Sequence, residues 1–179
     1  MTDSQLRRLN FIKPQFMYIG LISDTHGVFD APFKEFLAPV DEIWHAGDFG
    51  GGLDLAAAIS EFKPLVGVAG NCDNYDLRFT HPLHRFFECE GMKVLMTHIG
   101  GYPGNYDASI RSTLRTNPPT LFISGHSHIL KVMHDRHINT LHISPGAAGI
   151  HGFHKVRTLV RFTVNGAKFE DMEVIELSD

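Results

Sequence analysis

The sequence has few cysteines and no long apolar run. Its 179 residues include two cysteines, Cys72 and Cys89, which form neither a CxxC pair nor a disulfide framework. No apolar stretch approaches the roughly 20 residues that a membrane-spanning helix needs. The first residues, MTDSQLRRLNFIKPQF, lack the apolar core of a secretory signal. We therefore expect a cytoplasmic protein with no membrane partner.

The chain also lacks a concentration of basic residues. Its 16 lysines and arginines are scattered, and the 20 acidic residues leave a formal net charge of −4. Proteins that bind nucleic acid need a clustered basic surface against the phosphate backbone. We therefore expect no obligatory nucleic-acid partner. Length and composition fit one globular domain over residues 16–179, preceded by an N-terminal extension over 1–15.

The first half of the chain alternates strand and helix patterns, which predicts parallel strands joined by right-handed crossovers. Strands are predicted over 16–23, 42–46 and 64–70, and helices over 30–39 and 53–62. The first helix has Asp30 as its expected cap and Pro32 in its first turn.

The second half is richer in strand patterns. Strands are predicted over 84–90, 92–98, 120–125, 131–137 and 140–144, with one helix over 107–116 and a hairpin over 157–177. The hairpin turns at Asn165-Gly166, a strong turn signal. A parallel half followed by an antiparallel half predicts two sheets packed face to face, with helices outside.

Polar residues of metal-binding type follow five predicted strands. They are Asp24 and His26 in SDTHG, Asp48 in HAGDF, Asn71 in AGNCDN, His98 in THIGG, and His126 and His128 in SGHSHI. Loops at the carboxyl ends of such strands converge on one crevice, so the seven side chains can meet there. Oxygen and imidazole donors in this number suit two metals that share a carboxylate. Each motif alone also fits an ordinary turn, and the ordered set is what favours a metal centre.

The motifs DTH, GD, GNCD, a lone histidine and GHSH, in this order and spacing, resemble the calcineurin-like metallophosphoesterases, especially their small single-domain phosphodiesterase branch. The resemblance runs from about Tyr18 to about Gly149. It implies an α/β (α+β) fold, a four-layer αββα sandwich of two mixed β-sheets flanked by helices. It also implies how the ligands are shared: one metal by Asp24, His26 and His128, the other by Asn71, His98 and His126, and both by Asp48.

The same resemblance implies a hydrolase of small phosphorylated substrates, most simply phosphodiesters. A hydroxide held between two divalent metal ions would attack phosphorus, with Asp48, Asn71 and His98 near the reacting group. Manganese is the expected metal, and iron, zinc or nickel would suit the same ligands. Small members of the family can self-associate, so a homo-oligomer stays open.

Two other functions remain as alternatives. A relative of the same fold, the retromer scaffold subunit, lacks a complete ligand set and binds proteins, so a catalytically weak or inactive scaffold is the first. The second, a nuclease acting on polynucleotides, would need a basic groove or an added capping domain, for which 179 residues leave no room.

The sequence departs from the family pattern at two places. Cys72 stands where many members have a histidine that contacts the phosphate or protonates the leaving group. A thiol is a poorer partner for a developing alkoxide than an imidazolium, so we expect dependence on good leaving groups. No base for a nucleophilic Cys72 is identifiable in the sequence. The second departure is SPGAAG, residues 144–149, where related proteins tend to read NPGS.

Other polar residues near these motifs have simpler interpretations. His45, inside a predicted strand, is expected to pack or to support a ligand rather than bind metal. Asp73 suits either a plain turn or the orientation of a neighbouring ligand. His151 and His154 are expected to be solvated loop residues, with a place beside the metal crevice as the alternative. The run over 100–107 suits a substrate-side rim or an ordinary surface loop.

Overall fold

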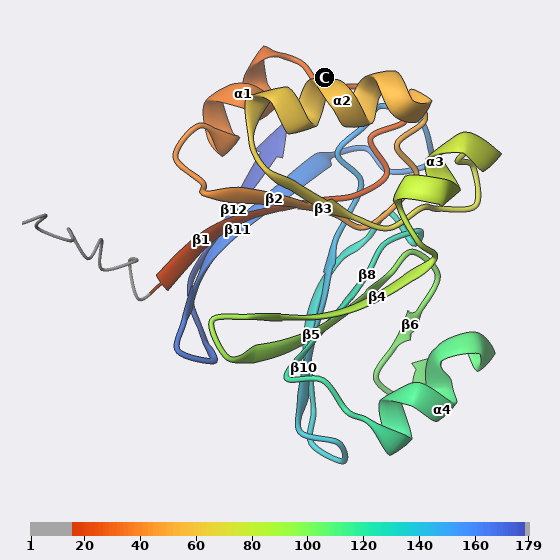
Figure 1. The fold of residues 1–179 in the computed structure, drawn as a ribbon, viewed down its shortest axis with the longest axis vertical. Helices are drawn as coiled ribbons and strands as arrows, with labels where there is room; N and C mark the ends of the chain where they lie inside the picture. The colour runs from red at the N-terminus through yellow and green to blue at the C-terminus, as the bar shows by residue number, and fades with distance from the viewer. Residues whose placement is uncertain (1–15, 178–179) are drawn as a thin grey trace, which may run out of the picture.

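A computed structural model describes residues 16–177 and contains two five-stranded sheets packed face to face (Figure 1). The expected extension over 1–15 lies outside the described residues. The first sheet has the order β12-β11-β1-β2-β3, with bounds Lys168–Leu177, Arg157–Asn165, Phe16–Ile22, Glu42–His45 and Leu65–Gly67. Strands β1, β2 and β3 run parallel, as predicted, and the C-terminal hairpin adds to β1 in antiparallel register.

The second sheet has the order β4-β5-β8-β10-β9. Its strands are His84–Cys89, Met92–Thr97, Leu121–Ser124, Thr140–Pro145 and Leu130–Asp135. The expectation of an antiparallel second half is wrong in part, because β5, β8 and β10 run parallel. Within this sheet the edge strands β4 and β9 are antiparallel to their neighbours. A short hairpin that was not predicted, β6 (Gly101–Tyr102) with β7 (Asn105–Tyr106), lies in the run over 100–107.

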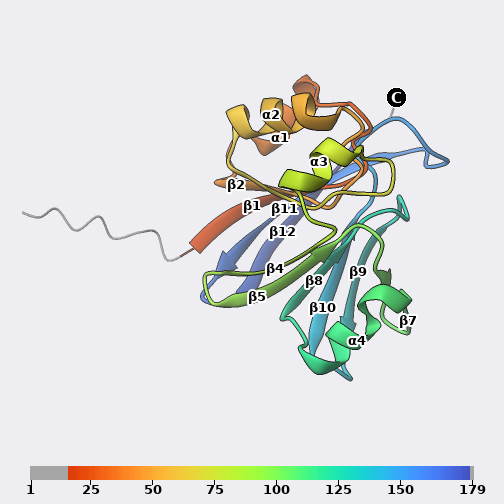
Figure 2. The ribbon, with the colours of Figure 1, turned by 45° about the vertical axis from the view of Figure 1, so that its right-hand side comes forward.

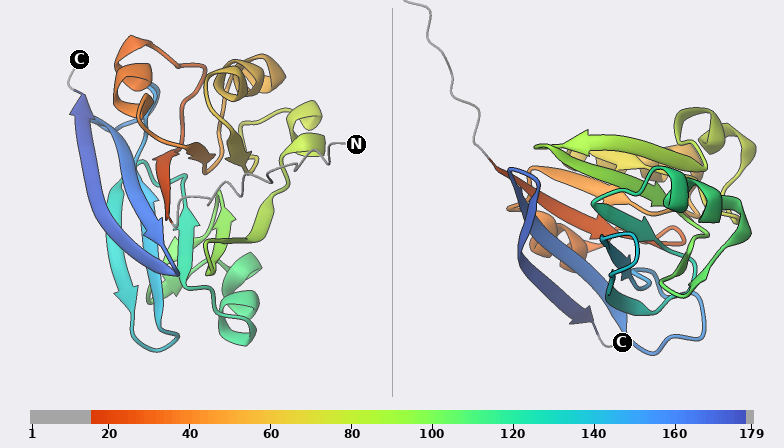
Figure 3. Two further views of the ribbon diagram at one scale, coloured as in Figure 1. Left: turned by 60° about the vertical axis from the view of Figure 1, so that its left-hand side comes forward. Right: turned by 90° about the horizontal axis from the view of Figure 1, so that it is seen from below.

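Helices cover the outer faces of both sheets (Figure 2). Helices α1 (Ala31–Leu37), α2 (Gly52–Phe62) and α3 (Tyr75–Thr80) lie on the side of the first sheet, and α4 (Ala108–Thr116) lies on the second. Separate apolar clusters fill the three spaces between the layers. The four-layer sandwich of mixed sheets is therefore confirmed, and Figure 3 shows the layers from two further sides.

Side-chain caps explain where the helices begin. The Asp30 carboxylate accepts a hydrogen bond from the Phe33 N–H at 3.3 Å, and Asp107 accepts one from Ser109 N–H at 2.9 Å. Asn74 caps the unpredicted α3, which is too short to show a helical apolar period. Within residues 16–177, no helix is long and apolar enough to cross a membrane.

Candidate metal centre

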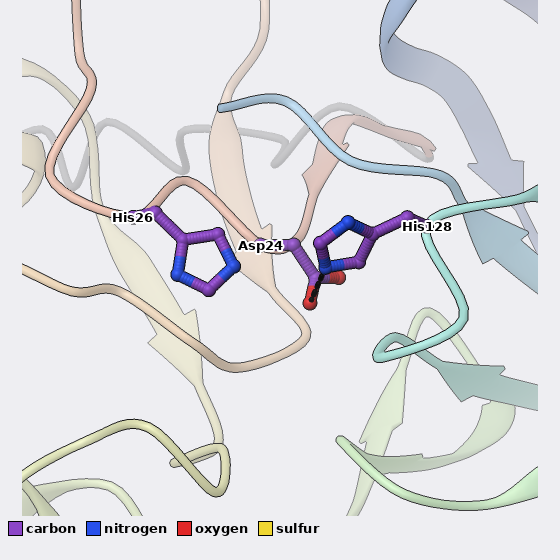
Figure 4. Close-up of side chains that lie close together, drawn as sticks. All are labelled: Asp24, His26 and His128. Atoms are coloured by element: carbon purple, nitrogen blue, oxygen red, sulfur yellow. Dashed lines mark ion pairs between the residues drawn. The ribbon is translucent and has the colours of Figure 1, made fainter. Parts of the chain in front are cut away.

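The loops after β1, β2, β3, β5 and β8 place the predicted ligands beside one another, where the two sheets meet. Three groups of side chains have ligand atoms within 4.8 Å of one another: Asp24, His26 and His128; His26, Asp48 and Cys72; Asp48, His98 and His126. Asp48 belongs to the second and third groups, and His26 belongs to the first and second, so the three groups are connected. The first group is shown in Figure 4, where His26, from the same loop as Asp24, and His128, from the loop after β8, lie on either side of Asp24.

Asp24 uses its two carboxylate oxygens differently. Its Oδ2 accepts hydrogen bonds from Ser23 Oγ at 2.6 Å and from the His126 N–H at 3.1 Å. Its Oδ1 lies 3.1 Å from His128 Nε2, the contact dashed in Figure 4, and 3.8 Å from His98 Nε2. The carboxylate is thus fixed through Oδ2, and Oδ1 faces the two histidine nitrogens.

Asp48 and His98 are held in the same way. Asp48 Oδ1 accepts from the Cys72 N–H at 2.8 Å, and its Oδ2 lies 3.2 Å from His98 Nε2. His98 Nδ1 donates to the Ala46 carbonyl at 2.8 Å, which leaves Nε2 without a proton in the neutral ring. Burial opposes the charged form of each group. The attraction between His98 and Asp48 outweighs this effect of burial. It raises the pKa of His98 and lowers the pKa of Asp48.

The remaining histidines of the set differ in exposure. Burial lowers the pKa of His26 against the attraction of Asp48 and Asp24, whereas the adjacent Asp24 carboxylate raises the pKa of His128 against burial. His126 is exposed, and its ring lies edge-on to His98 with centroids 5.2 Å apart. All three present imidazole nitrogens to the carboxylates.

Asn71 and Cys72 lie at the mouth of the site. The Asn71 amide donates to Cys72 Sγ at 3.3 Å, and Asn71 lines a pocket together with His98. Burial, the hydrogen bond to Asp48 and the nearby negative charges raise the pKa of Cys72 to about 11. Cys72 is therefore a protonated thiol at neutral pH in the metal-free protein.

Five of the seven predicted ligands have left-handed backbone conformations. Their φ angles are 53° at Asp24, 45° at His26, 57° at Asp48, 66° at His126 and 56° at His128. Such conformations cost about 1–3 kcal/mol at non-glycine residues and concentrate at functional sites. Hydrogen bonds between the loops hold them in place, including Asp24 N–H to Gly47 O at 2.9 Å and His26 N–H to Asp48 O at 3.2 Å.

His45 and Asp73 support these loops. His45 is fully buried and stacked on Phe49, donating through Nε2 to Thr25 Oγ1 at 2.9 Å and accepting through Nδ1 from the Gly47 N–H at 3.1 Å. This matches its expected packing role, and burial holds its pKa well below the usual value. The two Asp73 oxygens accept from the N–H groups of Gly50 and Gly70, tying together the loops after β2 and β3.

The expectation that His154 is a solvated loop residue is wrong. Its Nδ1 lies 3.1 Å from His128 Nδ1, and its Nε2 lies 2.8 Å from the Gly149 carbonyl. The sequence gives no signal for this contact, because the two histidines are 26 residues apart on different loops. His151 is exposed, with its ring 6.1 Å from that of His26.

The donor set fits divalent metal ions. Four side-chain atoms of the described residues are buried without a hydrogen-bond partner: Asp24 Oδ1, His98 Nε2, His142 Nδ1 and Arg161 Nε. The first two lie together in the site, where Asp24 Oδ1 is 3.8 Å from His98 Nε2. A buried unpartnered oxygen and nitrogen are costly unless a cation satisfies them. Carboxylate and imidazole ligands are the types that zinc, manganese and iron accept.

Comparisons with solved structures show the same fold. A predicted phosphoesterase from Streptococcus pneumoniae has a TM-score of 0.65 at 19% identity, over 92% of this chain and 98% of its own. A novel archaeal phosphodiesterase has a TM-score of 0.63 at 20% identity, over 90% and 100%. Wild-type Vps29 from Entamoeba histolytica, complexed with zinc, has a TM-score of 0.60 at 16% identity, over 89% and 99%.

A comparison of sequences gives the family. No curated protein matches the chain. The family model described as the calcineurin-like phosphoesterase superfamily domain matches residues 17–167, which include all seven predicted ligands. The chain therefore belongs to the calcineurin-like phosphoesterase superfamily.

Proposed function

We propose that the protein is a phosphodiesterase that depends on two divalent metal ions. The observation that carries this proposal is the pair of buried, unpartnered ligand atoms, Asp24 Oδ1 and His98 Nε2, at the centre of the predicted ligand set. One ion would be held by Asp24, His26 and His128, the other by Asn71, His98 and His126, and both by Asp48. When bound, the ions would activate a water and neutralise charge on the phosphate oxygens.

Two pockets beside the candidate metal ligands favour a phosphodiester substrate over a phosphomonoester. One, of about 470 Å³, borders His126 and carries the cationic side chains of Arg111 and Lys131. The other, of about 360 Å³, borders Asn71 and His98. A phosphate held at the metal ligands would have two adjoining pockets nearby, one for each ester substituent.

Cys72 limits the range of leaving groups in this proposal. Its thiol is exposed, and its backbone N–H is bonded to Asp48. A thiol is a weaker acid than an imidazolium for protonating an alkoxide. Aryl esters, whose leaving groups need little protonation, should react much faster than alkyl esters.

The likeness to Vps29 favours a second candidate, a protein-binding scaffold. That structure is a zinc complex, so bound metal alone does not distinguish a scaffold from an enzyme. The deciding experiment measures turnover. Protein purified without chelator is assayed for metal per chain and for hydrolysis of an aryl phosphodiester and an aryl phosphomonoester, before and after metal stripping and Mn²⁺ restoration.

The outcomes separate the candidates. Near two metals per chain with restorable hydrolysis, faster on the diester, supports the phosphodiesterase. Faster hydrolysis of the monoester would overturn the diester preference but not the metal centre. Bound metal without turnover of either ester supports the scaffold, and no bound metal would refute the proposed centre.

A further inference from the structure

The loop between β10 and β11 folds over one of the predicted ligands, His128; Figure 2 shows this loop projecting at the upper right. His154, near the end of the loop, contacts His128 through Nδ1 at 3.1 Å, with the two rings nearly perpendicular. Gly152 crosses directly beside this contact at φ 139°, and a Cβ there would meet the His128 ring. The close approach of the loop to His128 therefore requires glycine at position 152.

The hydrogen bonds of His154 determine where its protons are. The Gly149 carbonyl can only accept, so His154 Nε2, 2.8 Å away, carries a proton. In the neutral ring Nδ1 is then an acceptor, and His128 Nδ1 must donate to it. His128 Nε2 is left with its lone pair, 3.1 Å from Asp24 Oδ1. A chain of two hydrogen bonds thus runs from the Gly149 carbonyl to His128 Nδ1, and it leaves the other ring nitrogen, Nε2, free to act as the ligand atom.

The start of this chain is fixed to the strand end that carries Asp24. Gly149 N–H donates to Asp24 O at 3.0 Å, and Ala148 N–H donates to Ser23 O at 2.9 Å. Arg157 Nε donates to the Ala148 carbonyl at 2.8 Å and closes the base of the loop. The position of His154 is therefore set relative to Asp24 itself.

His98, the buried histidine of the candidate ligand set, is oriented differently. His98 Nδ1 donates directly to the Ala46 carbonyl at 2.8 Å, a backbone group next to β2. No side-chain change can remove that acceptor. The orientation of His128, in contrast, depends on one side chain.

We propose that His154 is a positioning residue that holds His128 in the tautomer and orientation that direct its Nε2 toward Asp24. It thereby sets the affinity of the site formed by Asp24, His26 and His128 for a divalent metal. This inference rests on the proposed metal centre. Loss of such a partner behind a metal-ligating histidine typically costs about 10- to 100-fold in metal affinity.

Metal titration of three variants tests the proposal. His154→Leu removes the acceptor, whereas His154→Asn places an amide oxygen close to the position of Nδ1. His151→Leu is the matched control, an exposed histidine of the same loop that makes no hydrogen bond to His128. Calorimetric titration of metal-stripped proteins with Zn²⁺ should show one site weakened about 10- to 100-fold in His154→Leu, largely recovered in His154→Asn and unchanged in His151→Leu.

A spectroscopic measurement on the wild type is independent of the variants. Long-range ¹H–¹⁵N spectra of the Zn²⁺-loaded protein should show His154 protonated on Nε2 alone and His128 on Nδ1. A His154 ring protonated on Nδ1, or Zn²⁺ affinity in His154→Leu equal to that of the wild type, would overturn the positioning role and leave the metal centre standing. Failure of the wild type to bind Zn²⁺ would overturn both.

Discussion

His98 Nε2 and Asp48 Oδ2, which come from different sheets, lie 3.2 Å apart. His98 follows β5 in the second sheet, Asp48 follows β2 in the first, and each is about 2% exposed. Their contact exists only when the two sheets are packed together. Any ligand that binds both residues should therefore stabilise the sandwich as a whole.

The first prediction concerns metal and stability. A divalent metal at about 100 times its dissociation constant should raise the free energy of unfolding by about 2.7 kcal/mol. In Asp48→Ala this increase, measured by urea denaturation with and without Mn²⁺, should disappear together with metal-dependent turnover, while the metal-free variant stays folded. An equal increase in the variant, or retained turnover, would rule out a bridging role for Asp48.

The second prediction concerns the hydroxyl beneath the site. Thr25 Oγ1 donates to the Phe49 carbonyl at 3.0 Å and accepts from buried His45 at 2.9 Å. Thr25→Val removes both hydrogen bonds while keeping the shape, so the metal-free protein should lose about 1–3 kcal/mol of stability. Thr163→Val, on the half-buried face of β11, is the control and should change stability by less than about 0.5 kcal/mol. Equal effects would show that the hydroxyl of Thr25 is dispensable.

The third prediction tests the strained backbone of the ligand loops. At His126, where φ is 66°, glycine relieves a conformation that alanine retains. Metal-free His126→Gly should therefore be more stable than His126→Ala by about 1 kcal/mol, although both lose a ligand. The control pair is Ser127→Gly and Ser127→Ala, because φ at Ser127 is not positive. Of these two variants, Ser127→Ala should be the more stable. If the alanine variant were the more stable at both positions, there would be no backbone strain at His126 for glycine to relieve.

Much of the candidate site was predictable because each candidate ligand follows a strand. Strand ends are visible as changes from apolar to polar residues, and loops at the carboxyl ends of parallel strands converge. The direction of β8 and β10 was not predictable, since apolar periodicity is the same in parallel and antiparallel strands. Helix α3 has six residues, too few for a helical period.

The supporting contacts were harder to predict. The hydrogen bond between His128 and His154 depends on the course of the whole β10–β11 loop, which no local pattern encodes. The left-handed conformations of Asp24 and His26 likewise come from hydrogen bonds to the loop after β2 rather than from residue type. Local chemistry therefore identifies the candidate ligands, and tertiary structure decides what holds them.

The last prediction concerns pH. His142 is a buried residue of β10, donates through Nε2 to Ser124 Oγ, and has its pKa lowered to about 4, by burial first and then by the charge of Lys131. Between about pH 6.5 and pH 4 the unfolded chain binds a proton here that the folded protein does not. Acidification over this range should therefore reduce the stability of the metal-free protein, by about 3 kcal/mol from this residue, with no effect above it.

Denaturation of metal-free protein at several pH values measures this contribution. His142→Gln, which keeps a donor for Ser124 but does not titrate, should lose less stability than the wild type between pH 6.5 and pH 4. Every other titratable group is common to both proteins, so the difference between their profiles isolates His142. His134→Gln, at an exposed position on β9, should follow the wild-type profile. Parallel profiles for wild type and His142→Gln would mean that His142 accepts a proton in the folded protein as readily as in the unfolded chain.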